Sequence, residues 1–149
     1  MAERNDPTRD PYSAHRFWVE IGGTYEGLFT ECSGLTSEVE VEEVKEGGQM
    51  GYIHRLPGRV KSFPNLVLKR GLATSDLWEW YCKVASGGKG AFQRQNLMIT
   101  LKGGNDLPVV RWEVIEALPI KWTGPSLKSA SGELAVETIE FIHNGFQRR

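Results

Sequence analysis

The stretch EGGQMGYIHRLPGRVKSFPNLVLKRGLATSDLWEWY, residues 46–81, decides the fold, because it joins a long glycine-rich loop to a strand and to the one predicted helix. Loops of this length inside a compact domain are uncommon and are usually functional or disordered. This one is too apolar for a linker. We therefore expect residues 46–63 to be an inserted assembly loop that docks on another molecule through Met50, Tyr52, Ile53, Arg55, Leu56, Arg59, Lys61 and Phe63.

The rest of the stretch predicts regular structure. Asn65–Arg70 is predicted as a strand that ends at Gly71. A helix is expected to begin at Thr74 or Ser75, either of which can cap it, and to end at Ser86-Gly87-Gly88. About 11 residues of helix cannot be stable alone, so this helix must pack on a sheet.

Alternating apolar and polar residues predict strands on both sides of this stretch. A Gly22-Gly23 turn joins the first two, and Gly103-Gly104-Asn105-Asp106 joins two later ones. A short segment with Trp122 lies between Pro119 and Gly124-Pro125. The predicted strands are Arg16–Ile21, Tyr25–Cys32, Leu35–Val44, Asn96–Lys102, Leu107–Ala117 and Glu133–His143, besides Asn65–Arg70.

About seven strands and one helix, connected mostly as hairpins, predict a mainly β fold. We expect an antiparallel β-sandwich or partly closed barrel with one flanking helix. Residues 1–13 are expected to be a mobile N-terminal arm, and residues 14–149 a single domain. Several late strands are apolar on both faces, although a packed sheet needs only one apolar face. One short helix cannot cover the excess, so the pattern predicts self-association.

Composition narrows the function classes. The formal net charge of -1 does not suggest a dedicated nucleic-acid binder. No apolar run is long enough for a membrane span, and residues 1–12 lack the apolar core of a signal peptide. We therefore expect synthesis in the cytoplasm without a signal peptide or membrane anchor. Cys32 and Cys82 are expected to be reduced, mostly buried thiols.

No residue pattern supports catalysis, a metal site or a cofactor. His15, His54 and His143 are far apart in the sequence and have no ligand-like neighbours. The serines lack the spacing of a nucleophile elbow, and Ser86-Gly87-Gly88-Lys89-Gly90 lacks that of a phosphate-binding loop. We expect no enzyme activity.

Two other groups of residues have alternative interpretations. The carboxylate row Glu38, Glu40 and Glu42 is either a solvated sheet face or an acidic channel lining that repels polyanionic cargo. The tryptophans could stack on single-stranded nucleic acid, but packing in the core or in a subunit interface is favoured for Trp18, Trp78, Trp112 and Trp122.

The order of motifs resembles one protein family over about residues 10–146. A DPY arm and FWVEI are followed by GLFTECSGL and a glutamate-rich strand, then by EGG, LPGR and NLVLKRG before the tryptophan-bearing helix. QNLMITL, VVRWEVIEALPIKWTGP and AVETIEFIHNGF complete the order. The chain resembles the tail tube proteins of contractile phage tails and the inner tube proteins of phage-tail-like contractile injection systems.

This resemblance implies a structural subunit that forms homohexameric rings, which stack into a hollow tube inside a contractile sheath. Sheath contraction drives the tube through a target envelope. The implied partners are other copies of the chain, the sheath protein, the baseplate or hub, tube-terminating proteins, and DNA or protein effectors in the lumen. The loop 46–63 would reach the next ring, and Glu38, Glu40 and Glu42 would be candidates for the lumen side.

Two alternatives stay open. The particle is either a virion tail or a cell-encoded injection particle, and the short, unadorned chain favours the latter. Outside this family, a monomeric OB-like β-barrel module binding nucleic acid or sugar would also fit a small β domain.

Overall fold

The fold is organised around one long strand, β8 (Pro108–Thr123), whose first and last parts pair with different strands. The computed structural model describes residues 17–45, 47, 51, 53–71, 76–87, 93–103, 107–130 and 132–149. The elements in chain order are β1 (Phe17–Ile21), β2 (Thr24–Leu28), β3 (Glu31–Ser33), β4 (Val39–Val44), β5 (His54–Val60), β6 (Leu66–Gly71), α1 (Asp76–Ser86), β7 (Gln95–Lys102), β8, β9 (Val136–Ile142) and β10 (Phe146–Arg148).

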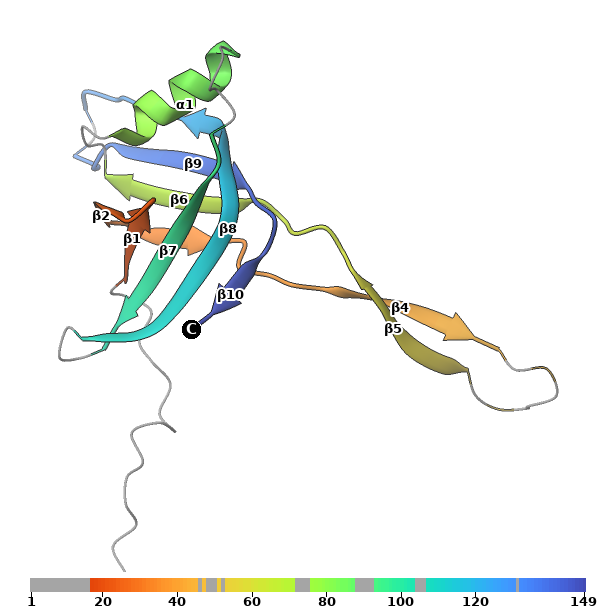
Figure 1. Cartoon of the computed structure of the whole chain (residues 1–149). Helices are drawn as coiled ribbons and strands as arrows, with labels where there is room; N and C mark the ends of the chain where they lie inside the picture. Colours follow the sequence, from red (N-terminus) through yellow and green to blue (C-terminus); the bar gives the residue numbers. More distant parts are fainter. Residues whose placement is uncertain are drawn as a thin grey trace, which may run out of the picture.

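All strand pairs are antiparallel, and the main sheet has the order β2-β1-β7-β8-β9-β6-β3, with β10 also paired to β8. The first part of β8 pairs with β7 and β10, and its last part, from Leu118, pairs with β9. Between these parts Glu116 has a φ of 50°, a left-handed conformation that redirects the strand. Figure 1 shows the result, in which β6 and β9 cross the β7–β8 pair to form a partly closed structure.

The core lies between these crossing layers. Its side chains alternate along each strand, so that β7 contributes Leu97, Ile99 and Leu101, and β9 contributes Ile139 and Phe141. The helix α1 closes one end by burying Leu77 and Trp80, with the Trp80 ring 5.8 Å from that of Phe141. The Trp80 indole N–H also donates to the carbonyl of Gln93 at 3.0 Å.

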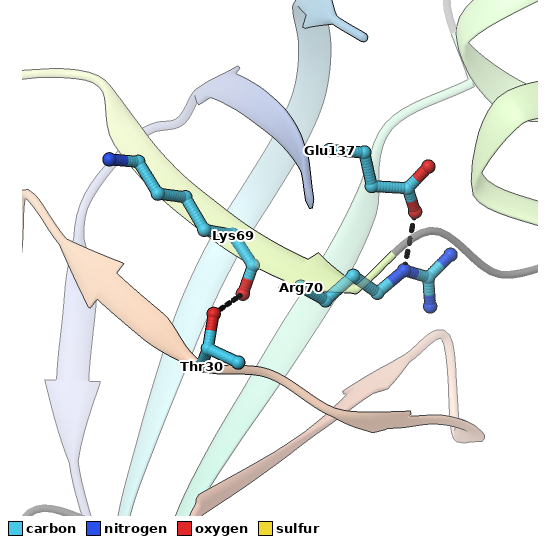
Figure 2. Close-up of polar contacts among 4 residues, drawn as sticks. All are labelled: Thr30, Lys69, Arg70 and Glu137. Carbon is cyan, nitrogen blue, oxygen red and sulfur yellow. Dashed lines mark hydrogen bonds and ion pairs between the residues drawn. The ribbon is translucent and has the colours of Figure 1, made fainter. Parts of the chain in front are cut away.

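One buried ion pair fixes the pairing of β6 with β9. Arg70 and Glu137 are direct cross-strand partners, and the Arg70 Nε donates to Glu137 Oε1 at 2.6 Å with both side chains at least 95% buried. The Arg70 guanidinium also lies 5.1 Å from the centre of the Phe29 ring. Figure 2 shows this pair beside the Thr30 hydroxyl, which donates to the Lys69 carbonyl at 3.1 Å. The segment after β2 is thereby attached to β6.

The predicted class is confirmed: the fold is mainly β, with antiparallel sheets and one flanking helix. The Gly22-Gly23 hairpin is present, and the helix ends where predicted, with Gly87 at a φ of 66°. The predicted cap residues Thr74 and Ser75 and the arm 1–13 lie outside the described residues.

Several strand boundaries were predicted wrongly. The predicted strand Tyr25–Cys32 is two strands, because the chain leaves β1 after Leu28 and pairs with β6 from Glu31. Leu107–Ala117 continues to Thr123 through Pro119, and the last long strand begins at Val136 instead of Glu133. β10 was not predicted, since three residues are too few to show a periodicity.

Candidate functional site

The most prominent surface feature is a two-stranded ribbon formed by β4 and β5, which pair only with each other. Figure 1 shows it projecting well beyond the body, and we call it the projecting hairpin (residues 38–45 and 53–61). The sequence predicted an irregular loop over residues 46–63, but residues 54–60 are a strand. Pro57 obscured it, because proline argues against a central strand and is tolerated only where a strand has a free edge, as here.

One side of the projecting hairpin is apolar. Val39 lies opposite Val60, and Val41 lies opposite Pro57, so these four residues share a side that we call the valine face. Its three valines are 43%, 61% and 50% exposed, in chain order. A shallow groove runs along this face, with the ion pair of Glu43 and Arg55, 3.6 Å apart, at its end.

The other side carries the predicted carboxylate row, and we call it the carboxylate face. Glu40 and Glu42 alternate with the valines, and Glu38 continues the row. β5 and the residue that follows it place cations opposite this row. Lys61 Nζ lies 3.0 Å from Glu38 Oε1, and Arg59 Nε lies 4.0 Å from Glu40 Oε2. These pairs are exposed, so each contributes at most about 1 kcal/mol.

The base of the projecting hairpin is held to the body by aromatic rings. Phe63 packs against His143 and Phe146, with ring centres 5.5 Å and 5.9 Å apart. Phe63 also covers Gly145, where a Cβ would lie 3.1 Å from the ring. Phe63 is therefore half-buried at the base, whereas the other described residues of the predicted docking set lie along the hairpin.

A second close contact holds the incoming strand of the hairpin. Gly34 has a φ of 96°, and a Cβ there would lie 2.1 Å from the carbonyl oxygen of Asn65. Only glycine fits this approach. The two chain segments entering and leaving the hairpin are thus fixed side by side.

The structure locates the other predicted docking residues on the hairpin. Ile53, Arg55, Leu56, Arg59 and Lys61 are all exposed, while Met50 and Tyr52 lie outside the described residues. Sequence reasoning missed the anchoring roles of His143, Gly145 and Phe146. It also missed the pairing of β4 with β5, although the acids of EVEVEE and the bases of RLPGRVK were an available signal.

The four singled-out tryptophans lie in different environments. Trp112 and Trp122 are half-buried against the core. Trp78 is 47% exposed on α1 and packs edge-on against Trp122, with ring centres 4.9 Å apart. Trp18 is half-buried, and the Lys102 ammonium lies 4.2 Å from its ring centre. The most buried tryptophan, Trp80, was not among the four.

Potential metal ligands do not cluster in the described part of the chain. No group of three or more His, Cys, Asp or Glu side chains there is placed to hold a metal ion, and no helix there is long and apolar enough to cross a membrane.

Cys32 and Cys82 are free thiols. Cys32 is half-buried, and burial raises its pKa to about 12, whereas Cys82 is exposed. The prediction that both are mostly buried is therefore wrong for Cys82.

Comparison with known proteins identifies related chains. A family model described as T4-like virus tail tube protein gp19 matches residues 13–147. No curated protein sequence matches this chain.

Several solved structures have chains with a similar fold over nearly the whole length of this chain. A chain of the anti-feeding prophage (AFP) baseplate, 6-fold symmetrised, is 27% identical, with a TM-score of 0.80 over 94% of this chain and 96% of that chain. A chain of the AFP tube terminating cap is 26% identical, with a TM-score of 0.77 over 100% and 99%. A chain of the PVC sheath-tube complex of an extracellular contractile injection system has the same fold at 24% identity, with a TM-score of 0.80 over 95% and 93%.

Proposed function

This chain belongs to the T4-like virus tail tube protein gp19 family, and from that premise we propose that it is the subunit of a hollow tube built from stacked homohexameric rings. The tube would be the inner conduit of a contractile injection apparatus. Contraction of the surrounding sheath would drive it through a target envelope. The role is structural and requires no reaction at the subunit.

The observation that carries this proposal is the projecting hairpin. A two-stranded ribbon is only marginally stable alone in water, yet this one exposes three valines on one face. The apolar face needs a partner molecule to cover it. We propose that the hairpin reaches another copy of the chain and joins successive rings.

Six copies per ring are supported by the related AFP baseplate structure, which was 6-fold symmetrised. Apolar side chains also stay exposed on the body, at Val109 and Ile120 of β8 and at Val136 of β9. We propose that these strand positions, together with Trp78, contribute to contacts between neighbours within a ring. Assembly would then cover the apolar strand surface that the sequence predicts to exceed what one chain can bury.

The partners follow from the same relatives. Because related chains come from a baseplate and a tube terminating cap, we propose that this tube meets a baseplate at one end and a terminating protein at the other, inside a sheath.

We favour an injection particle that delivers protein effectors over a virion tail that passes DNA. The carboxylate face of the hairpin, with Glu38, Glu40 and Glu42, is the side that we propose for contact with water in the lumen.

Size-exclusion chromatography with light scattering, combined with negative-stain imaging of the purified chain, tests the proposal. Rings or tubes of uniform width are expected. The rival function, an OB-like module that binds nucleic acid or sugar, instead requires a stable monomer with salt-sensitive affinity for oligonucleotides. A monomer at high concentration, with or without such affinity, would overturn the proposed assembly.

A further inference from the structure

The turn between β9 and β10 contains the only Asn-Gly pair of the sequence, Asn144-Gly145 (Figure 1). Asparagine is a thermolabile residue in proteins. When glycine follows it, the glycine backbone nitrogen can attack the side-chain amide carbon, because no Cβ on the glycine shields that nitrogen. Asn144 is exposed, and Gly145 is buried with a φ of 119°. Water therefore reaches the asparagine side chain, while packing fixes the glycine.

The attacking nitrogen already has a base beside it. The Gly145 N–H donates to His143 Nδ1 at 3.1 Å, so the Nδ1 lone pair faces the proton that the reaction has to remove. A neutral imidazole that accepts through Nδ1 carries its own proton on Nε2. The ring is held in this orientation by Phe63 and Phe146, whose ring centres lie 5.5 Å and 6.3 Å from that of His143. His143 therefore meets the distance requirement for a general base.

The leaving nitrogen of Asn144 also has a partner. Asn144 Nδ2 donates to Glu116 Oε2. The backbone of Glu116 is fixed in turn, because its N–H donates to Asn96 Oδ1 at 3.0 Å and its carbonyl accepts from Arg94 Nη1 at 3.1 Å. A carboxylate held at this place stabilises the positive charge that develops on a departing nitrogen.

Backbone contacts hold both members of the Asn-Gly pair in place. The Asn144 N–H donates to the Ile115 carbonyl at 2.9 Å, and the Ile115 N–H donates to the Gly145 carbonyl at 2.8 Å. A Cβ at Gly145 would lie 3.1 Å from the Phe63 ring, so the packing at the base of the projecting hairpin favours glycine here. The turn thus combines a nucleophile, an electrophile and a base from three consecutive residues.

We propose that Asn144 is a self-modification site, at which the chain converts its own asparagine to aspartate or isoaspartate with His143 as the base. The Gly145 nitrogen forms a bond to Asn144 Cγ while its proton passes to His143 Nδ1. The Cγ–Nδ2 bond then breaks, the proton returns from His143 to the leaving nitrogen, and ammonia departs beside Glu116. Water opens the cyclic imide at either carbonyl, so the net reaction consumes one water and releases one ammonia.

The product would weaken the base of the projecting hairpin. Either product carries a negative charge next to Glu116 in place of a hydrogen-bond donor, and like charges at this separation repel each other. Isoaspartate also adds a methylene to the backbone between residues 144 and 145, which shifts Gly145 relative to Ile115 and to the covering ring of Phe63. The reaction would therefore act as a slow clock that loosens the anchor of the hairpin. It takes place within one chain and does not depend on tube assembly.

Peptide mass spectrometry of the purified chain, sampled during incubation at neutral pH, tests the modification. Replacing the amide NH2 by a hydroxyl raises the mass of the peptide that contains Asn144 by about 1 Da and adds a negative charge. Electron-transfer fragmentation distinguishes aspartate from isoaspartate. We expect the folded chain to convert faster than the same chain in guanidinium chloride, where His143 no longer lies beside Gly145. Asn65, which precedes a leucine, should stay unmodified in the folded chain.

A folded chain that converts more slowly than the unfolded chain, or at an equal rate, would overturn the proposed modification and leave the proposed function standing. Two variants then test the base. His143→Phe keeps a ring between Phe63 and Phe146, and His143→Gln keeps a polar side chain, but neither has the imidazole. Each should slow the conversion of the folded chain by about 100-fold, the lower end of the range for a general base, and leave the rate in guanidinium chloride unchanged.

Circular dichroism must show that these variants are folded. An unchanged rate in either folded variant would overturn the role of His143. If neither variant folds, the comparison of the folded and unfolded parent chain decides.

Converted chains test the loosening of the anchor. They are separated from unconverted chains by ion exchange, because they carry an additional negative charge. Amide hydrogen exchange over residues 61–66 and 143–148 should be faster in the converted chains. Equal exchange in the two forms would overturn the proposed clock.

Discussion

Replacing the three valines of the valine face by threonine, as Val39→Thr/Val41→Thr/Val60→Thr, should weaken assembly without unfolding the subunit. Threonine keeps the β-branched shape and the strand preference, but it introduces a hydroxyl that is costly to bury. The three positions are 43%, 61% and 50% exposed, so about half of each valine remains to be covered by a partner.

The magnitude follows from this exposure. Full burial of a valine contributes about 1.5–3 kcal/mol, so half burial contributes about 0.8–1.5 kcal/mol and three valines about 2–4 kcal/mol per hairpin. This free energy corresponds to an association about 30-fold to 1,000-fold weaker. Sedimentation velocity across a concentration series measures the shift, and thermal unfolding measures the stability of the subunit.

Val44→Thr is the matched control, because Val44 lies on the same strand with 41% exposure but on the opposite face. It should change the assembly midpoint by much less than Val41→Thr alone. The reasoning is refuted if the triple variant assembles at the parent concentration, or if Val44→Thr is as damaging as Val41→Thr.

Three further predictions concern the subunit itself. Glu137→Gln should lower the free energy of unfolding, measured in urea, by about 3–5 kcal/mol, because it leaves Arg70 buried without its counter-charge. The double variant Arg70→Met/Glu137→Leu should leave this free energy close to that of the parent. Equal losses of stability in the two variants would contradict this. Gly34→Ala should destabilise the fold by more than Gly23→Ala. Both glycines have a positive φ, but a new Cβ at Gly23 would have no atom within 4 Å. Similar losses of about 1–3 kcal/mol in both variants would mean that the contact of Gly34 with Asn65 is unimportant. A maleimide at pH 8 should modify Cys82 and spare Cys32, because the raised pKa of about 12 keeps the Cys32 thiol protonated. Mass spectrometry locates the label. A labelled Cys32 in the folded chain would refute this prediction.

The sequence predicted most of the body because its signals are local. Alternation placed β1, β6, β7 and β9 to within a few residues, and the glycines after Ser86 ended the helix. The long path of β8 was harder to predict, because Pro119 looked like a terminus. The strand accepts it at an irregularity of register between Pro119 and Lys121, a feature of the pairing that one strand alone cannot reveal.

The projecting hairpin shows the other limit of prediction. Its apolar content predicted a docking segment, but the glycines and Pro57 favoured a loop over the strand that β5 forms. Pairing of β4 with β5 joins residues up to 21 positions apart, from Val39 to Val60, and no periodicity encodes such a partner. The anchor at Phe63 depends on His143 and Phe146, which are still farther away in the sequence.

The participation of β8 in both crossing layers of the body has a mechanical consequence. A load applied to the β1–β7 side reaches β9 and β6 along a continuous covalent backbone, instead of crossing only side-chain contacts. The two layers therefore cannot slide past each other unless a ladder of backbone hydrogen bonds breaks together. Such a subunit resists shear as a single rigid block, which is the property that the proposed tube would require when it is pushed lengthwise against a barrier.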